Sequence, residues 1–372
     1  MNYQSLNRSL PATLIVTAQG LKCMPLALKI VGPSEAKMQQ YEEPPLQSEE
    51  VRVRSEFSAI KHGTELRKYR ADSRDYSAAF DWERGIHREG ETATPEYPLP
   101  AGNMTVGTIV DVGDSVSEFT AGDRVYGYLP IKESHAVSTD EINRVPDGMS
   151  PEAVVYTDPA RVGLYVVRTG MVRPGDRVAV FGAGAIGLMA MQLATLQGAN
   201  WVAVSEPIAK RRAAARKHGA DLTINPFDSD PGSLNRDATD DGPVEGVDIA
   251  LETSGVYAGL SDAIRATAFD GTIASCGYYD DNVSSLDLAG EWHRNALDIR
   301  SVRPPSEPLR DHPRWNLDRL TDTAFRLLRD EYLSVDDLID PVVPLADAAD
   351  GLTLIDERPA ESIKLGITYD GE

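Results

Sequence analysis

Short apolar runs separated by turn residues dominate the chain from about residue 24 to residue 150. Runs patterned like strands lie at 24–31, 50–57, 105–112, 123–128 and 143–146. Glycine punctuates them at Gly107, Gly113, Gly122 and Gly127. Short strands divided by such turns predict a small β-rich domain.

The pattern changes at about residue 151, where longer helical stretches begin to alternate with short apolar runs. Helices are expected at 151–171, 186–197, 209–218 and 260–268, and strands at 177–181, 201–205, 222–225, 247–252, 271–276 and 296–302. This alternation predicts the α/β class, with a doubly wound parallel sheet. A helix at 319–329 and a strand at 362–369 follow, and the pattern leaves their place open.

A polar insertion between residues 70 and 97 lacks clean periodicity and carries Tyr76, Phe80, Trp82 and His87. Long irregular insertions are either disordered or functional. If functional, this one is suited to covering a substrate cleft.

A glycine fingerprint stands where the 177–181 strand meets the next helix. Gly182, Gly184 and Gly187 have the GxGxxG spacing. The first glycine permits a tight turn, the second lets the backbone approach a pyrophosphate, and the third lets the helix pack close to its strand. The phosphates then meet the positive end of the helix. We therefore predict a dinucleotide site, against the alternative of glycines that serve packing alone.

Cofactor choice depends on Glu206, which follows the 201–205 strand. A carboxylate at this position accepts hydrogen bonds from the ribose hydroxyls and repels a 2′-phosphate, which favours NAD. Ser205, Lys210 and Arg211 lie close by and suit a 2′-phosphate, so NADP stays open.

Length and composition narrow the class of protein. The 372 residues suffice for two or three domains. No apolar run approaches the roughly 20 residues of a membrane helix, and the apolar stretch at 14–18 is too short for a secretion signal, so we expect a cytoplasmic protein. Cys23 and Cys276 are the two cysteines, which excludes a cysteine-based zinc lobe and gives no support for a disulfide framework.

The net charge of −21 excludes the basic footprint that nucleic-acid binding requires. The expected partner is a small-molecule substrate, with neither nucleic acid nor membrane. Aspartate is abundant and lysine scarce, a balance that favours a halophilic protein over an ordinary acidic one.

Eight short motifs follow one another along the chain. They are FSAIKHGTE at 57–65, VGTIVDVG at 106–113, GDRV at 122–125, PGDRV at 174–178, the glycine fingerprint, HGAD at 218–221, VD at 247–248 and SG at 254–255. In this order they resemble the medium-chain dehydrogenase/reductase superfamily. The resemblance implies a GroES-like catalytic domain (24–158), a Rossmann domain (159–302) and a C-terminal return (303–372). It also implies a homodimer or homotetramer in which the strand near 297–302 pairs across a two-fold axis. An N-terminal arm is expected at 1–23, because the first strand pattern begins at residue 24.

The zinc-dependent members hold their metal through three side chains, and this sequence departs from their pattern. His62 stands at the first ligand position, Asn103 and Met104 replace the second ligand's His-Glu pair, and Asp158 replaces a glutamate. Catalytic zinc normally has three protein ligands. We therefore expect no bound metal, although His62 and Asp158, with Glu65 or water, leave a residual zinc site open.

The resemblance also implies the site residues. His62 is the expected general acid/base, Thr64 the proton-relaying hydroxyl, and Asp158 a group that orients His62 or binds a sugar hydroxyl. The predicted cofactor-binding residues are Gly182, Gly184, Ala185, Ile186, Gly187, Glu206, Arg211, Thr253, Ser254 and Gly277. Arg67 takes the position of a later relay histidine and does not release protons.

The leading functional hypothesis is an NAD(P)-dependent oxidoreductase that transfers hydride to or from a polyol, a sugar or a related hydroxylated molecule. A metal-free enone or quinone reductase is the second hypothesis. A non-catalytic dinucleotide-binding protein is the third, because the altered ligand set leaves loss of catalysis open.

Overall fold

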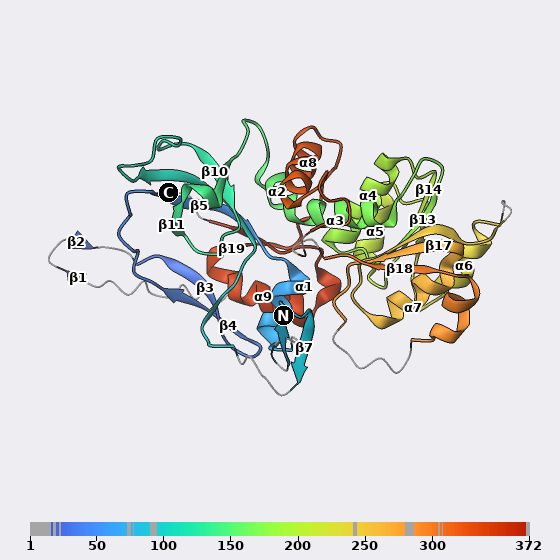
Figure 1. Cartoon of the computed structure of the whole chain (residues 1–372). Coiled ribbons are helices and arrows are strands. Elements are labelled where there is room, and N and C mark those ends of the chain that lie inside the picture. The colour runs from blue at the N-terminus through green and yellow to red at the C-terminus, as the bar shows by residue number, and fades with distance from the viewer. Residues whose placement is uncertain are drawn as a thin grey trace, which may run out of the picture.

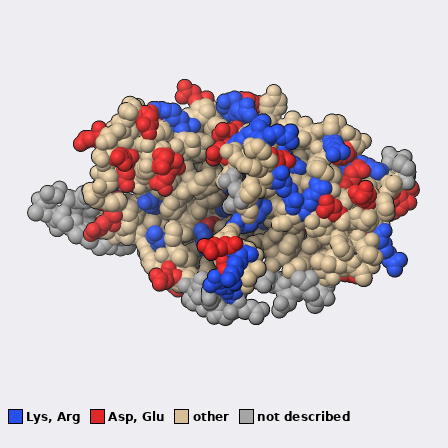
Figure 2. Space-filling view, viewed as in Figure 1, with Lys and Arg blue, Asp and Glu red and all other residues tan. Residues whose placement is uncertain are grey.

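The structure is a computed structural model that describes residues 16–17, 20–21, 24–72, 76, 78–89, 95–240, 244–279, 286–303, 306 and 308–369. Two lobes lie side by side, one rich in strands and one in which helices flank a sheet (Figure 1). Helices α2 (Pro151–Val155), α3 (Thr157–Gly170) and α8 (Leu317–Arg329) lie between them. On the face seen in Figure 2, acidic side chains lie over both lobes, interleaved with Lys and Arg.

A mixed, mainly antiparallel sheet forms the first lobe. Its strands run in the order β12-β10-β9-β5-β20-β19, and β11 also pairs with β5. They are β5 (Glu50–Ala59), β9 (Met104–Val112), β10 (Arg124–Gly127), β11 (Ser134–Ser138), β12 (Ile142–Arg144), β19 (Val342–Pro344) and β20 (Gly366–Thr368). Because β20 pairs with the end of β5, where Ile367 faces Ser58, the end of the chain closes the lobe that its beginning opened.

Smaller elements complete this lobe. They are β1 (Val16–Thr17), β2 (Gly20–Leu21), β3 (Leu26–Gly32), β4 (Glu35–Gln40), β8 (Leu99–Pro100), η2 (Thr139–Glu141), η4 (Leu345–Asp347), η5 (Pro359–Glu361), α1 (His62–Arg70) and α9 (Ala348–Glu357). One core cluster joins side chains of β3 and α9, among them Leu28, Ile30, Leu352 and Ile355. Apart from β1 and β2, the predicted arm 1–23 lies outside the described residues.

The second lobe is the predicted doubly wound sheet, and its six parallel strands run β15-β14-β13-β16-β17-β18. The strands are β13 (Arg177–Phe181), β14 (Trp201–Ser205), β15 (Leu222–Ile224), β16 (Val247–Glu252), β17 (Thr267–Ser275) and β18 (Asp298–Ser301). Its helices are α4 (Ala185–Gln197), α5 (Ala209–Lys217), α6 (Pro231–Asp237) and α7 (Tyr257–Ala266). The strand order reverses between β13 and β16, which is where such sheets bind ligands.

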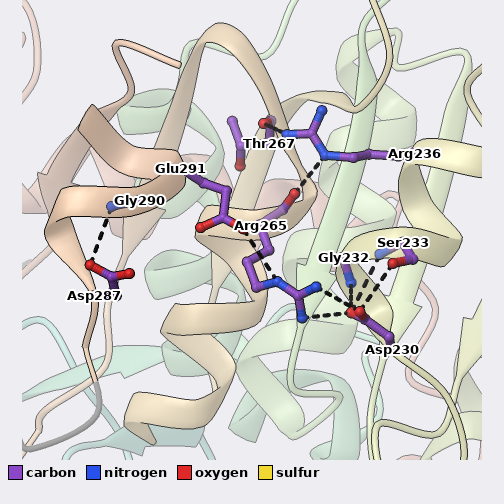
Figure 3. Close-up of polar contacts among 9 residues, drawn as sticks. All are labelled: Asp230, Gly232, Ser233, Arg236, Arg265, Thr267, Asp287, Gly290 and Glu291. Atoms are coloured by element: carbon purple, nitrogen blue, oxygen red, sulfur yellow. Dashed lines mark hydrogen bonds and ion pairs between the residues drawn. The ribbon is translucent and has the colours of Figure 1, made fainter. Parts of the chain in front are cut away.

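Polar contacts hold α6, α7 and the π-helical turn η3 (Leu288–Trp292) together (Figure 3). Asp230 caps α6 and also receives the Arg265 guanidinium of α7, with Nη1–Oδ1 and Nη2–Oδ2 distances of 2.9 and 2.6 Å. Arg236 donates to the carbonyl oxygens of Arg265 and Thr267, 2.8 Å from each. These polar contacts join the three elements to one another.

Two predicted elements differ from the structure. The helix expected at 151–171 is interrupted at Tyr156, which ends α2 and begins α3, and whose hydroxyl donates to the Leu338 carbonyl at 2.8 Å. The strand expected from residue 271 begins at Thr267. In both cases a tertiary contact or strand pairing sets the boundary, which the local pattern does not record.

The insertion at 70–97 forms a hairpin of β6 (Ala78–Asp81) and β7 (Ile86–Glu89) in its described part. The Phe80 ring meets Trp82 and His87 edge-on, at centroid distances of 4.8 and 4.9 Å. Trp82 is 70% exposed, and the Arg303 guanidinium lies 4.9 Å above its ring. The hairpin therefore contacts the segment that follows β18.

In the described part of the chain no helix is long and apolar enough to cross a membrane. Strand β18 pairs with β17 and, among the described residues, with no other strand. It stands where the sequence placed the sixth strand of the sheet.

Candidate active site

A cavity of about 660 Å³ lies at the junction of the lobes. One wall comes from the ends of β13, β14 and β16, and the other from the start of α1, the start of α3 and residues 363–364. Segments from three distant parts of the sequence meet there, so residues 60 and 364 face the same space.

The glycine turn at the end of β13 has the geometry that the fingerprint predicts. Gly182 has φ +93°, and a Cβ there would lie 2.8 Å from the Ser254 Cα. A Cβ on Gly187 would lie 1.9 Å from the Gly182 carbonyl oxygen. A Cβ on Gly184, which caps α4, would meet no atom within 4 Å. The turn is thus closely packed on one side and open beside Gly184, where the backbone is free to approach a pyrophosphate.

Glu206 is buried at the end of β14 and is held by the backbone. Its Oε2 accepts the Ala183 N–H at 2.7 Å, and its Oε1 accepts the Ile208 N–H at 2.9 Å. Each carboxylate oxygen has a second lone pair. The carboxylate is therefore fixed next to the glycine turn and retains acceptor capacity toward a ribose.

The two cations that kept NADP open are both bonded to the C-terminal segment. Arg211 Nε donates to the Ser362 carbonyl at 2.9 Å. Lys210 Nζ donates to the Glu361 carbonyl at 2.8 Å and pairs with Asp340. Both side chains therefore tie α5 to the C-terminal segment.

Nine predicted cofactor-binding residues line the cavity: Gly182, Gly184, Ala185, Ile186, Gly187, Glu206, Arg211, Thr253 and Ser254. Gly277 is not among the lining residues. It lies in the loop that follows β17, where its Cβ would come 2.7 Å from Glu252 Oε2.

Glu252, at the end of β16, is a buried residue that the sequence analysis missed. Its Oε1 accepts the Ser254 and Gly255 N–H groups at 2.8 and 3.2 Å, and its Oε2 accepts the Tyr279 hydroxyl. Burial raises the pKa of Glu252 in spite of these bonds. One carboxyl group thus organises the loops after β16 and β17.

His62 begins α1 and lines the cavity, but one of its ring nitrogens is already engaged. Nε2 accepts the Leu365 backbone N–H at 2.9 Å. Burial, with Lys364 and Arg211 nearby, lowers the pKa of His62 to about 3. The ring is therefore neutral at pH 7 and, since Nε2 is the acceptor, its proton is assigned to Nδ1. The neutral ring therefore has one N–H donor, at Nδ1, and no free acceptor nitrogen.

Asp158 lies in the first turn of α3 and is 1% exposed. Lys61 Nζ is 2.9 Å from Oδ2, and Arg161 Nη2 is 2.6 Å from Oδ1. Asn103 Nδ2 donates to Oδ2 at 3.3 Å. Burial alone would raise the pKa of Asp158, but Lys61 and Arg161 outweigh it and hold the pKa below its usual value.

Lys364 is a second lysine beside this carboxylate. It is 1% exposed, and its Nζ donates to the Ile60 carbonyl at 2.9 Å. Burial lowers the pKa of Lys364 to about 8, with Asp158 opposing the shift and Lys61 adding to it. The sequence did not reveal the roles of Lys61, Arg161 and Lys364, although Lys61 lies inside the FSAIKHGTE motif. The residues next to each of them in the sequence do not show that all three surround Asp158.

The structure does not bring the remaining candidates into the cavity. Thr64 is exposed and is not a lining residue. Glu65 is buried, accepts the Gly102 N–H at 3.0 Å and pairs with Lys68 at 2.7 Å, so it braces the turn before Asn103. Among the described residues, no three His, Cys, Asp or Glu side chains are grouped closely enough to hold a metal ion.

Comparisons with known proteins agree with this architecture. The family described as "Alcohol dehydrogenase GroES-like domain" matches residues 48–188, and "Zinc-binding dehydrogenase" matches residues 185–306. D-guloside 3-dehydrogenase from Escherichia coli is 37% identical over 350 residues, 92% of this chain and 99% of its own length. The chain belongs to the zinc-type alcohol dehydrogenase-like proteins of the medium-chain dehydrogenase/reductase superfamily.

Two further relatives extend the comparison. Sorbitol dehydrogenase from Bacillus subtilis is 29% identical over 52% of this chain and 63% of its own length. The crystal structure of 2R,3R-butanediol dehydrogenase from Bacillus subtilis has a TM-score of 0.73 at 20% identity and covers 93% of this chain and all of its own, which shows the shared fold. The predicted family and fold class are confirmed, and the chain is an NAD(P)-dependent oxidoreductase of the alcohol dehydrogenase type.

Proposed function

We propose that this enzyme oxidises a carbinol of a sugar or polyol with NAD as the hydride acceptor. The observation that carries the proposal is the junction cavity, where the glycine turn and Glu206 face the polar cluster of Asp158, Lys61 and His62. A hydroxyl-rich ligand suits such a concentration of charged and polar groups. The similarity to D-guloside 3-dehydrogenase along nearly the whole chain favours a glycoside.

NAD is the preferred cofactor in this proposal. Glu206 is fixed beside the turn, and its charge repels a 2′-phosphate. Arg211 lines the cavity and attracts Glu206 electrostatically. Its Nε and the Lys210 Nζ are, however, already bonded to carbonyl oxygens of the C-terminal segment, which leaves both cations fewer donors for a 2′-phosphate. When bound, the nicotinamide accepts the hydride.

We further propose that catalysis is independent of zinc. The residues at the family's ligand positions have other partners: His62 Nε2 faces a backbone N–H, Asn103 replaces a histidine, and the Asp158 oxygens face cations. A divalent ion beside Asp158 would have to displace the Lys61 ammonium. The donor set therefore does not fit a catalytic zinc site.

Within this proposal His62 and Asp158 act on the substrate. His62 donates from Nδ1 to a substrate oxygen, because its Nε2 lone pair is occupied by Leu365. Asp158 holds the cations in place and lies within reach of a hydroxyl near the cavity wall. The proton-relay role of Thr64 stays a prediction, as does that of Gly277 in binding the cofactor.

The test is a panel of polyols and of methyl glycosides, including methyl α-D-guloside, assayed by NADH formation with NAD and NADP in parallel on chelator-treated enzyme. We expect turnover of at least one sugar, a kcat/KM at least tenfold higher with NAD, and no dependence on added zinc. Turnover of enones or quinones alone would favour the metal-free reductase. Cofactor binding without any turnover would contradict the proposal.

The acidic composition and strand β18, which pairs only with β17 among the described residues, support two wider proposals. We propose that the protein is adapted to high salt, since its net charge of −21 creates self-repulsion that concentrated ions screen. We also propose a homodimer or homotetramer in which β18 pairs with its copy, because an exposed sheet edge is otherwise a liability.

A further inference from the structure

The Lys61 side chain occupies a distinctive position at the cavity. Lys61 is the N-cap residue of α1, its side chain is 27% exposed, and it lines the cavity beside His62 and Gly63. Its Nζ is 2.9 Å from Asp158 Oδ2. An ammonium group has three N–H donors, so one bond to Asp158 leaves donor capacity for a ligand oxygen.

The charges around Asp158 do not balance within the cluster. A single carboxylate faces Lys61 and Arg161 directly and the Lys364 ammonium at longer range. The cluster therefore has an excess of positive charge where the ends of β13 and β16 meet the first lobe. Such an excess favours an oxygen on which negative charge develops.

The three cations are not equivalent. Arg161 is 9% exposed, lies beneath the Tyr128 ring at 5.2 Å, and is not a lining residue. Lys364 is 1% exposed, and its ammonium is bound to the Ile60 carbonyl. Lys61 combines a buried counterion with partial exposure to the cavity, so it is the cation best placed to contact a ligand.

We propose that Lys61 is a catalytic residue that donates a hydrogen bond to the reacting oxygen and so takes over the electrostatic role of the family's zinc ion. The inference rests on the proposed function. The carbinol C–H bond breaks and its hydrogen leaves with both electrons to the oxidised nicotinamide. The O–H bond breaks, its proton passes to solvent water, and a C=O bond forms. Lys61 stays protonated throughout and stabilises the charge that develops on oxygen, while Asp158 holds the ammonium in position.

The experiment compares Lys61→Met, which removes the charge at similar length, with Lys61→Arg, which keeps a cation. Lys37→Met is the matched control, because Lys37 is exposed on β4 and pairs with Glu35. We expect Lys61→Met to lower kcat by about 10²- to 10³-fold, the cost of removing one such donor. Lys61→Arg should retain at least tenfold more activity than Lys61→Met, and Lys37→Met should match the parent enzyme.

A second readout needs no turnover. Calorimetry follows the binding of methyl α-D-guloside to the NADH-loaded enzyme, and of NADH alone. Loss of the Lys61 donor should weaken glycoside binding about tenfold and leave NADH binding within twofold. Adding n-propylamine to Lys61→Ala should restore at least tenfold of the lost kcat, which a purely structural lysine would not show.

The outcomes separate the two proposals. If the parent enzyme oxidises glycosides and Lys61→Met keeps more than a third of kcat, the Lys61 proposal is overturned while the proposed function stands. Stoichiometric zinc in the active parent enzyme, removed by chelator together with activity, would also overturn it. If the parent enzyme oxidises no sugar or polyol, the proposed function fails and the Lys61 role falls with it.

Discussion

At the scale of single residues, burial without a charged partner decides the state of several ionisable groups. His135 on β11 is 1% exposed, and its Nε2 shares a hydrogen bond of 3.1 Å with the Ser55 hydroxyl. Burial, with Lys132 nearby, lowers the pKa of His135 to about 3. The native state therefore excludes a proton that the unfolded chain binds near its usual pKa of about 6.5.

This difference predicts a loss of stability in acid. Between pH 6.5 and 3 the unfolded state binds more protons than the native state, so the free energy of unfolding falls as pH falls through this window. Between pH 7 and pH 5, His135 alone lowers the free energy of unfolding by about 2 kcal/mol. Urea unfolding at pH 7 and pH 5 should show a loss about 2 kcal/mol smaller for His135→Gln than for the parent protein. Equal losses would contradict the assignment.

At the scale of elements, the glycines of the turn between β13 and α4 have two different roles. Gly182 and Gly187 make room for the protein's own backbone, at Ser254 and at the Gly182 carbonyl. Gly184 has open space around it. Gly182 and Gly187 are therefore needed for the turn to pack, whereas Gly184 is expected to leave room for a ligand pyrophosphate.

This division predicts opposite effects of one substitution at two positions. Gly187→Ala should lower stability by roughly 1–3 kcal/mol, because the added methyl group overlaps backbone that must move. Gly184→Ala should leave the unfolding temperature unchanged and weaken NADH binding at least tenfold, because the methyl group stands where the pyrophosphate approaches. Thermal unfolding and NADH fluorescence titration measure the two effects. Unchanged NADH affinity in Gly184→Ala would argue against a pyrophosphate at this turn.

At the scale of the whole molecule, the two lobes are held in register by bonds from α5 to the C-terminal segment. Arg211 contacts Ser362, and Lys217 pairs with Asp337. The same segment places Leu365 against His62 and Lys364 beside Ile60. The end of the chain thus joins the side of the cavity that carries the glycine turn to the side that carries Lys61 and His62. On the face seen in Figure 2, acidic side chains lie over both lobes, interleaved with Lys and Arg.

The surface charge predicts a response to salt. At 1 M salt the Debye length falls to about 3 Å, so repulsion among surface carboxylates is screened. Raising KCl from 0.1 to 2 M should therefore raise the thermal unfolding temperature. NaCl at equal ionic strength serves as the control, because screening does not distinguish the two cations. A fall in unfolding temperature with either salt would contradict adaptation to salt.

The sequence by itself determined the elements whose pattern is local. Alternation of strand and helix after residue 151 predicted the parallel sheet, and the glycine spacing at 182–187 identified the turn that lines the junction cavity. It did not predict α1, which is mostly polar and whose buried residues are Glu65 and Tyr69.

Only the tertiary structure decided how the charged wall of the cavity, opposite the glycine turn, is built. Lys61, Asp158 and Lys364 lie far apart in the chain, and each is an ordinary charged residue in its local context. Their ionisation states depend on how deeply each side chain is buried and on which opposite charge faces it. For Lys364, both depend on the pairing of β20 with β5. The donor role proposed for His62, in place of the expected general acid/base, likewise depends on a backbone N–H 303 residues away that occupies its Nε2. The spacing of residues in the sequence predicts where helices, strands and turns form. Which charged side chains meet is decided only when distant segments pack together.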